Sequence, residues 1–415
     1  MKILITSIGT RGDMEPFLAI GEMLKNKRHE VMYLFPEQFR TLAEESNTEF
    51  ASLGNEFMEM LESDTGKFAL GGGGSTGKKI FAYIKLAKIQ SRNNRLMVER
   101  QFKTVSEYKP DRIVHHGKVM YPVIWEINNP GKTVFVSPVP YLHYVKRHTH
   151  LAFHSNYGEF FNKLTYKLAD WGLKKAIMMA VKWLQATGIT KRQVKNALKN
   201  HKTIYAVSPQ LFERPGYWKE NLQVLGFHER DKTTNWQPDN ELIQFLEKHS
   251  KIILVTFGSM TNPEPEKKTG IILNILKRNN IPAIINTCSG GLTEPEAYDR
   301  DLFHFVQGIP YDWIFPKVYG VIHHGGSGTT HMAIKNGCVS LIIPHIIDQF
   351  VWDRIAYEKG IGPRGIKISK MTEKNLEPKI LELINNSSFK EKARQLGEKM
   401  RSENFIEELY NQIIK

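Results

Sequence analysis

Residues 320–350, GVIHHGGSGTTHMAIKNGCVSLIIPHIIDQF, decide how this chain folds. The stretch begins with a short β-branched run that predicts a buried strand, and two histidines lead from it into a glycine-rich turn. A helical segment, THMAIKNG, follows the turn, and VSLIIPH predicts a second buried strand. A strand, a helix and a further strand in this order form a βαβ unit, in which the two strands lie parallel.

The same alternation of strands and helices runs through the rest of the chain. At the amino end, KILITSI (2–8), EPFLAIGEMLKNKR (15–28) and HEVMYLFP (29–36) predict a strand, a helix and a strand. The pattern starts again at KIILVTFGSM (251–260). Repeated units of this kind build parallel sheets with helices on both faces. We therefore predict an α/β protein with two Rossmann-like, doubly wound domains that face one another.

Four segments are expected along the chain. Residues 1–222 form an amino-terminal domain. Residues 223–250 form a linker and the entry to the second domain, because GFHERDKTTNWQPDNE is polar and contains proline. Residues 251–393 form the second domain. Residues 394–415 are helical in pattern and are expected to pack back across the two domains.

Composition narrows the class of protein. The chain has 415 residues, a formal net charge of +14 and two cysteines, Cys288 and Cys338. Two cysteines exclude a disulfide framework and favour a reducing compartment, so we expect a cytoplasmic protein. No uncharged apolar run reaches the roughly 18 residues that a membrane-spanning helix needs. The positive charge favours an anionic substrate or an anionic membrane surface, and no nucleic-acid-binding motif is visible.

The turn HHGGSGTT (323–330) has the features of an anion-binding site. A helix that begins directly after a strand and a glycine turn presents free backbone N–H groups and the positive end of its dipole at one point. Only one of His323 and His324 can face the turn, because adjacent residues of a strand point to opposite faces, and this disfavours a metal site on the pair. We predict a phosphate site; a structural glycine turn is the alternative.

A second glycine-rich stretch, GGGGSTGKK (71–79), is close to the phosphate loop of nucleoside triphosphatases. Gly72, Gly77 and Lys78 fit the pattern of that loop, but Lys79 stands where it needs a hydroxyl for magnesium. No convincing strand precedes the stretch, and four consecutive glycines favour a mobile loop over a fixed cradle. We therefore predict a flexible loop; the phosphate loop of a kinase is the alternative.

Three segments resemble GT-B glycosyltransferases, in particular the sterol glucosyltransferases and the bacterial transferases that glycosylate natural products. Residues 320–363 resemble the donor-binding segment of that family, residues 9–31 its first loop and helix, and PYDWIF (310–315) the segment before the donor strand. The resemblance covers both predicted domains in the same order. It implies the GT-B fold and the transfer of a sugar from a nucleotide diphosphate donor.

The resemblance also implies roles for individual residues. His324 corresponds to the histidine that contacts the donor diphosphate, and Asp13 corresponds to the general base. Because Asp is also favoured at the start of a helix, an N-terminal cap is the alternative role for Asp13. The remaining assignments are the diphosphate cradle of Gly326, Ser327, Gly328, Thr329, Thr330 and Ser259, the sugar-hydroxyl pair of Asp348 and Gln349, and the nucleobase region at the backbone of Gly308 and Ile309.

The chain departs from the family pattern at Ile347, where relatives commonly have glycine before the Asp–Gln pair. A larger side chain there crowds the sugar site. UDP-glucose is the donor expected first, and a deoxysugar donor, dTDP- or UDP-rhamnose, is the alternative. No acidic residue is assigned to the donor phosphates, so we expect a reaction that needs neither a metal ion nor a cofactor. With Asp13 as the base opposite the donor, a single displacement is expected to invert the anomeric configuration.

The acceptor is expected to be a lipophilic small molecule, such as a flavonoid or other polyphenol, a sterol or a polyketide. Segments 55–85 and 138–200 are expected to form its pocket. Residues 141–202 are strongly basic and rich in bulky apolar side chains. This pattern is typical of a basic outer face over packed helices; the alternative is a hydrophobic acceptor pocket, or a surface that rests on the inner face of an anionic membrane. Three other functions stay open: a sugar-nucleotide epimerase of the same fold, a transferase acting on a membrane lipid, and a catalytically inactive binding protein.

Overall fold

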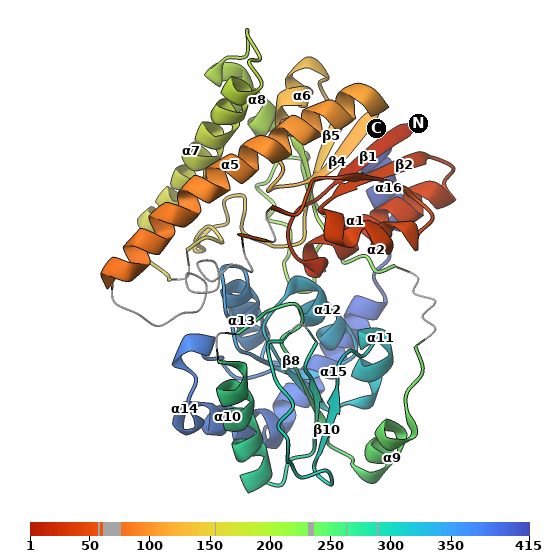
Figure 1. Cartoon of the computed structure of the whole chain (residues 1–415), viewed down its shortest axis with the longest axis vertical. Helices are drawn as coiled ribbons and strands as arrows, with labels where there is room; N and C mark the ends of the chain where they lie inside the picture. Colours follow the sequence, from red (N-terminus) through yellow and green to blue (C-terminus); the bar gives the residue numbers. More distant parts are fainter. Residues whose placement is uncertain (57–58, 61–75, 154, 231–235, 263, 289) are drawn as a thin grey trace. The chain divides into compact units, whose positions relative to one another are not determined.

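The computed structural model describes residues 1–56, 59–60, 76–153, 155–230, 236–262, 264–288 and 290–415 (Figure 1). The described residues form two compact units. Among these residues, the first unit contains 1–56, 59–60, 80–153, 155–230 and 404–415, and the second contains 76–79, 236–262, 264–288 and 290–403, so the first four residues of α5 (Thr76–Tyr108) are grouped with the second unit. Each unit is built on its own parallel sheet, so the predicted α/β class with two doubly wound domains is confirmed.

The first unit's described residues form a seven-stranded parallel sheet in the order β3-β2-β1-β4-β5-β6-β7. Its strands are β1 (Lys2–Thr6), β2 (Glu30–Phe35), β3 (Glu49–Ser52), β4 (Arg112–His116), β5 (Thr133–Ser137), β6 (Lys202–Tyr205) and β7 (Leu222–Val224). Its helices are α1 (Arg11–Asn26), α2 (Arg40–Glu44), α5 (Thr76–Tyr108), α6 (Tyr121–Asn128), α7 (Glu159–Trp183), α8 (Lys191–Asn200) and α16 (Ile406–Ile414). The strand order reverses between β1 and β4, and such sheets bind ligands outside the carboxyl ends of the strands at this point.

The second unit's described residues form a five-stranded parallel sheet in the order β10-β9-β8-β11-β12. Its strands are β8 (Ile253–Thr256), β9 (Ala283–Asn286), β10 (Phe303–Val306), β11 (Gly320–His323) and β12 (Val339–Ile342). Its helices are α9 (Asn240–Lys248), α10 (Pro265–Arg278), α11 (Tyr311–Ile314), α12 (Ser327–Lys335), α13 (Gln349–Glu358), α14 (Glu373–Asn385) and α15 (Ser387–Arg401). Here the order reverses between β8 and β11, and the turn predicted to bind an anion follows β11.

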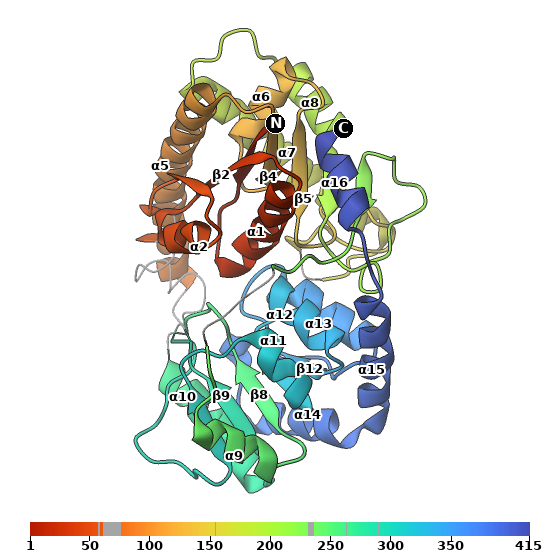
Figure 2. The same ribbon diagram turned by 90° about the vertical axis from the view of Figure 1, so that its right-hand side faces the viewer.

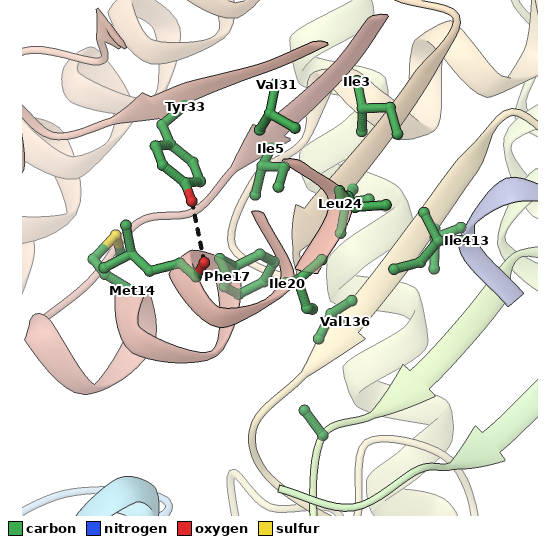
Figure 3. Close-up of a cluster of buried hydrophobic side chains, with 14 of the residues drawn as sticks. Ile3, Ile5, Met14, Phe17, Ile20, Leu24, Val31, Tyr33, Val136 and Ile413 are labelled. Atoms are coloured by element: carbon green, nitrogen blue, oxygen red, sulfur yellow. Dashed lines mark hydrogen bonds between the residues drawn. The ribbon is translucent and has the colours of Figure 1, made fainter. Parts of the chain in front are cut away.

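The core of the first unit explains why β1 lacks an alternating polar pattern. Ile3 and Ile5 are buried in one apolar cluster with α1, whereas Leu4 is buried in a second cluster on the other face of the sheet. Both faces of the strand are therefore covered, as is typical of parallel sheets. Figure 3 shows the first cluster, in which the Tyr33 hydroxyl donates a hydrogen bond of 3.1 Å to the carbonyl oxygen of Leu18.

The last helix of the chain, α16, belongs to the first unit. Leu409 and Ile413 lie in the same apolar cluster as α1, and His29 contacts the hydroxyl of Tyr410 at 3.1 Å. Figure 2 shows α16, in dark blue, beside the strands of this unit. The preceding helix, α15, packs against α12 in the second unit. The chain thus enters the second unit after β7 and returns to the first unit for its final helix.

Two strands and part of one loop differ from the sequence-based predictions. β3 and β7 were not predicted, because each is a short edge strand without a long β-branched run, and β7 spans the predicted boundary at residues 222 and 223. In the stretch predicted as a flexible loop, residues 71–75 lie outside the described residues, while Thr76 already begins α5. Much of the expected acceptor segment 55–85 lies outside the described residues too.

Candidate active site

The predicted anion-binding turn joins β11 to α12 in the second unit. Gly326 is the residue before α12, and Ser327, Gly328, Thr329 and Thr330 form its first turn. The Thr330 N–H donates to the carbonyl oxygen of Gly326 at 2.9 Å, whereas the N–H groups of the three residues before it have no partner inside the helix and lie at the positive end of its dipole. The Thr330 hydroxyl donates to the carbonyl oxygen of Gly326 at 2.8 Å and is fully buried, so this side chain supports the turn from within.

The His324 ring is held by two glycines. A Cβ atom on Gly258 would lie 2.8 Å from Cε1 of His324, and a Cβ atom on Gly326 would lie 2.5 Å from its Nε2. Glycine at both positions therefore lets the ring lie flat against the backbone, with Nε2 beside the start of α12. Burial, and then the neighbouring His323 and His345, lower the pKa of His324 well below its usual range. The ring is neutral at pH 7 and offers one N–H as a hydrogen-bond donor.

His323 lies on the other side of the strand end. Its side chain is fully buried, and the backbone N–H of Gly325 donates to its Nδ1 at 3.2 Å. Burial lowers the pKa of His323 to about 3. The two adjacent histidines therefore have different surroundings: His323 contacts the backbone of Gly325, and His324, which is also buried, lies against Gly258 and Gly326.

The Asp–Gln pair begins α13, next to the same turn. Asp348 is the residue before the helix, and Gln349 is its first residue. The Gln349 side-chain oxygen accepts hydrogen bonds from the backbone N–H groups of His345 at 2.7 Å and Ile346 at 3.1 Å, which fixes the loop after β12. A Cβ atom on Gly325 would lie 3.1 Å from the carbonyl oxygen of Gln349. The turn and the pair are thus in direct contact, and Ile347 beside them is 49% exposed.

The other assigned residues of the second unit lie at strand ends of the same edge. Ser259 follows β8 and is exposed. Gly308 is exposed after β10, whereas the Ile309 side chain is buried in the apolar core, so that only its backbone can meet a ligand. The structure brings Ser259 near the His324 turn, because the preceding Gly258 lies against the His324 ring.

Asp13 lies in the first turn of α1, at the carboxyl end of β1. Its Oδ2 accepts a hydrogen bond of 2.8 Å from the backbone N–H of Thr10, which completes a reciprocal cap of the helix. Gly9 has φ +143°, and a Cβ atom there would lie 2.0 Å from Oδ2 of Asp13. The N-cap of α1 is Thr10, so the alternative of Asp13 as the N-cap is wrong: Asp13 is the third residue of the helix, and its carboxylate completes the capping box through Oδ2, which leaves Oδ1 outside the cap.

The last residue of β4 and a lysine that follows the strand lie close to Oδ1 of Asp13. The Lys118 ammonium donates to Oδ1 of Asp13 at 3.0 Å, and Nε2 of His116 lies 3.7 Å from the same atom. The backbone N–H of Lys118 lies 3.5 Å from Nδ1 of His116. If Nδ1 accepts this contact, the proton of the neutral ring is on Nε2, so His116 faces Asp13 as a donor.

The charges and hydrogen bonds around Asp13 lower its pKa by more than burial raises it. Burial alone raises the pKa of this carboxyl, but Lys118 first and then His116, together with the hydrogen bonds from Lys118 and Thr10, bring the pKa below its ordinary value. Burial lowers the pKa of His116 to about 3, with Lys118 acting in the same direction. At neutral pH the site is therefore an ionised carboxylate beside a neutral imidazole and an ammonium group.

Sequence analysis identified Asp13 but missed His116 and Lys118. The available signal was RIVHHG (112–117), a strand that ends in the same His-His-Gly sequence as β11. β4 pairs with β1 in parallel, with Thr6 opposite His115, so the carboxyl ends of the two strands meet. The sequence alone did not show that these two strands are neighbours.

An Asp-x-Asp tripeptide is present at residues 299–301, immediately before β10. Asp301 pairs with Lys248 at 2.9 Å, and Asp299 lies 3.7 Å from Lys277. These carboxylates precede a strand, at the edge of the sheet opposite the His324 turn, and each faces a lysine. No group of three or more His, Cys, Asp or Glu side chains with metal-binding geometry occurs in the described residues.

Each unit carries a group of side chains with its own chemistry. The second unit offers an anion-binding helix start with a neutral histidine donor, directly beside a carboxylate and an amide. The first unit offers an ionised, tightly held carboxylate that can accept a proton. A phosphate ester attached to a hydroxyl-rich group matches the former, and an attacking hydroxyl matches the latter.

Comparison with known proteins shows which enzymes this chain resembles. Residues 3–124 match the glycosyltransferase family 28 N-terminal domain, and residues 301–415 match the C-terminal domain of erythromycin biosynthesis protein CIII-like proteins. A sterol 3-beta-glucosyltransferase of Arabidopsis thaliana is 27% identical over 98% of this chain, which spans 64% of that protein's length.

Solved structures have the same fold. A calicheamicin glycosyltransferase superposes with a TM-score of 0.70 at 15% identity, covering 99% of this chain and 97% of the other. A spinosyn rhamnosyltransferase bound to thymidine diphosphate superposes with a TM-score of 0.64 at 13% identity, covering all of both chains. The chain therefore has the GT-B fold that the sequence motifs predicted, and the proteins that it resembles in sequence are glycosyltransferases.

Proposed function

We propose that this protein is an inverting, metal-independent glycosyltransferase that moves a hexose from a nucleotide diphosphate sugar to a hydroxyl group of a lipophilic small molecule. The observation that carries the proposal is the contact between the His324 turn and the Asp348–Gln349 pair, because it joins a diphosphate site to a sugar-hydroxyl site. UDP-glucose is the donor proposed first. The exposed Ile347 side chain beside the pair supports a deoxysugar such as rhamnose as the alternative.

In the proposed reaction, the acceptor oxygen bonds to the anomeric carbon of the donor as the bond from that carbon to the diphosphate oxygen breaks. The acceptor's proton passes to Asp13, and the electron pair of the broken bond leaves with the diphosphate. Backbone N–H groups at the start of α12 and the neutral His324 stabilise the charge that develops there. A single displacement of this kind inverts the anomeric configuration.

The low pKa of Asp13 defines how it acts in this scheme. A carboxylate that is this weak a base cannot deprotonate a free alcohol in advance. It accepts the proton late, when the attacking oxygen has become acidic through its new bond to carbon. His116 faces the same oxygen as a donor, so it orients the carboxylate and does not replace it as the base.

The test is turnover of nucleotide sugars with sterols and phenols, followed by mass spectrometry, in the wild type and in Asp13→Asn. Asparagine keeps an oxygen that can accept from the Thr10 N–H, so the helix cap survives while the base is lost. We expect about 10²–10⁴-fold slower transfer. A parallel reaction without acceptor tests the epimerase alternative, because an epimerase would change the sugar of the donor. That outcome contradicts the proposal, and so does an unchanged rate of transfer in Asp13→Asn.

We also propose that α7 rests on an anionic membrane surface, from which a lipophilic acceptor is taken. Phe160, Leu164, Leu168 and Trp171 share one helix face by their spacing and are 76%, 40%, 51% and 62% exposed. Beside them, Lys163 and Lys167 form a basic row. An apolar hollow of about 470 Å³ opens at the start of the helix. Apolar side chains flanked by lysines suit an interface with anionic lipid.

Vesicle co-sedimentation tests this surface. Binding is expected to vesicles of phosphatidylglycerol with phosphatidylcholine at low salt, and not to phosphatidylcholine alone. The double variant Phe160→Ser/Trp171→Ser should lose binding, whereas Tyr357→Ser, which removes a similarly exposed aromatic ring from α13, should not. Equal binding by all three proteins overturns this part of the proposal. In the described residues, no helix is both long and apolar enough to cross a membrane.

A further inference from the structure

A fully buried tyrosine at the end of β6 fixes the ring of a histidine that follows β5. Tyr205 is the last residue of β6 and is fully buried. Its hydroxyl accepts a hydrogen bond of 2.9 Å from the backbone N–H of His143 and lies 2.6 Å from Nδ1 of the same residue. The Tyr205 ring also stacks on Trp218, which makes an edge contact with the His143 ring. His143 is therefore held at its backbone and at its ring.

These contacts decide which nitrogen of His143 carries the proton. Burial lowers the pKa of His143 to about 4, so the ring has one proton at pH 7. The backbone N–H must donate to the Tyr205 oxygen. If Nδ1 donated as well, the buried hydroxyl proton of Tyr205 would have no acceptor in the described part of the chain. The hydroxyl therefore donates to Nδ1, and the proton of the ring is on Nε2.

The Nε2–H group of His143 is left for a ligand. Nε2 makes no hydrogen bond to the residues that the structure describes, and it is not one of their buried polar atoms that lack a partner. It is therefore open to solvent, in agreement with the partial exposure of the residue. Because the tautomer and the ring orientation are fixed beforehand, this donor loses little freedom when it binds an oxygen of a ligand.

The segment that carries His143 is strained and tightly held. Tyr141 is a bulky residue with φ +62°, a conformation that such residues seldom adopt. Its ring stacks on His148 at 4.6 Å between centroids, and the Trp218 side chain donates to the carbonyl oxygen of Tyr144 at 2.8 Å. Strain of this kind persists where surrounding contacts impose it, and it is concentrated at ligand sites. The segment therefore has the character of a preformed binding loop.

The register of the sheet places this donor at the carboxyl edge of the first unit, the edge at which such folds bind ligands. His116, at the end of β4, and Tyr205, at the end of β6, lie on either side of the last two residues of β5. Neighbouring strands lie about 4.8 Å apart, so β4 and β6 are separated by roughly 10 Å. Asp13 contacts the end of β4, and His143 contacts the end of β6. A molecule that reaches both is elongated.

We infer that His143 binds a second oxygen of the acceptor, at the end remote from the hydroxyl that receives the sugar. The inference rests on the proposed function, because it adds a contact to the acceptor site of the same reaction. It also selects among the acceptor classes. A polyphenol or a polyketide has oxygens at both ends of an elongated molecule, whereas a simple sterol has only the hydroxyl that would react. A site that holds a donor for an oxygen rejects molecules without that oxygen, so the acceptor is of the former kind.

Transfer to a matched pair of phenols tests the inference. One phenol, 4-hydroxy-4′-methoxybiphenyl, has an ether oxygen at the end opposite its hydroxyl, and the other, 4-phenylphenol, lacks it. Both are assayed with the full chain and a nucleotide sugar. For the wild type we expect kcat/KM to be roughly three- to tenfold higher for the methoxy compound, the value of one hydrogen bond.

Four variants separate binding by His143 from a general effect on the fold. His143→Phe keeps an aromatic ring and should lose the preference, through a lower kcat/KM for the methoxy compound alone. His143→Gln supplies an amide donor and should regain part of it. Tyr205→Phe removes the hydroxyl that fixes the ring and should weaken the preference although His143 is present. The control is His249→Phe, a partly exposed histidine of the second unit whose Nε2 contacts the carbonyl oxygen of Asp301, and it should keep the preference. Thermal unfolding shows whether each variant is folded.

Three outcomes contradict the inference. They are an equal kcat/KM for the two phenols in the wild type, an unchanged preference in His143→Phe, and transfer only to alcohols with a single oxygen, such as sterols. In each case sugar transfer itself has been observed, so the proposed function still holds. If the wild type transfers sugar to no alcohol, the proposed function has failed.

Discussion

The ammonium of Lys118 lies 3.0 Å from Oδ1 of Asp13, although the two residues are 105 positions apart in the sequence. The contact joins the carboxyl ends of β1 and β4, where the strand order of the first unit reverses. It keeps the proposed base ionised and at the same time weakens it, because a nearby positive charge stabilises the carboxylate.

Replacing Lys118 with methionine should therefore move the acid limb of the pH–rate profile. Activity requires ionised Asp13, so it falls as the pH drops through the pKa of this carboxyl. Lys118 lowers that pKa. Its removal raises the pKa, and the acid limb of kcat/KM shifts to higher pH. Lys118→Arg keeps the charge and should leave the limb in place. If the acid limb does not shift in Lys118→Met, a group other than Asp13 controls the loss of activity at low pH.

The close packing of His324 on glycine gives a second prediction. In Gly326→Ala the new Cβ atom would lie only 2.5 Å from Nε2 of His324. The imidazole ring must therefore move away from the start of α12. We expect nucleotide diphosphate affinity to fall by about tenfold, the value of one good hydrogen bond to a charged group. Gly270→Ala, on α10, meets no atom within 4 Å and is the matched control. Equal affinities of the two variants would contradict the proposed role of the ring.

Gln349 should contribute to stability as well as to sugar binding. Its side-chain oxygen accepts from the backbone N–H groups of His345 and Ile346. Gln349→Leu leaves both groups without a partner, which costs about 1–3 kcal/mol for each group that stays buried. Gln349→Glu keeps an acceptor oxygen, so its free energy of unfolding should fall by less than that of Gln349→Leu. Urea unfolding measures both variants, and a Gln349→Leu protein as stable as the wild type would show that the loop finds other partners.

The final helix should stabilise the first unit. Ile413 is fully buried in the cluster with α1, whereas Ile406, at the start of the same helix, is 48% exposed. Ile413→Ala is expected to lower the free energy of unfolding by about 2–5 kcal/mol. Ile406→Ala is the same chemical change outside the core and should stay within about 0.5 kcal/mol of the wild type. Similar losses in both variants would contradict the packing described for α16.

The sequence by itself determined the fold class and most of the second unit's site. Strand and helix periods differ, so the alternation of 2–8, 15–28 and 29–36 identified βαβ units without tertiary information. The His324 turn was predictable for the same reason, because its strand, glycines and helix are consecutive. Short edge strands such as β3 and β7 were missed, since their pairing depends on neighbours that are distant in the chain.

The tertiary structure decided which distant residues meet. His116 and Lys118 reach Asp13 because β4 pairs with β1, and this strand order cannot be read from local patterns. Sequence periodicity reports which face of an element is apolar, whereas the field around a charged group depends on everything that packs against it.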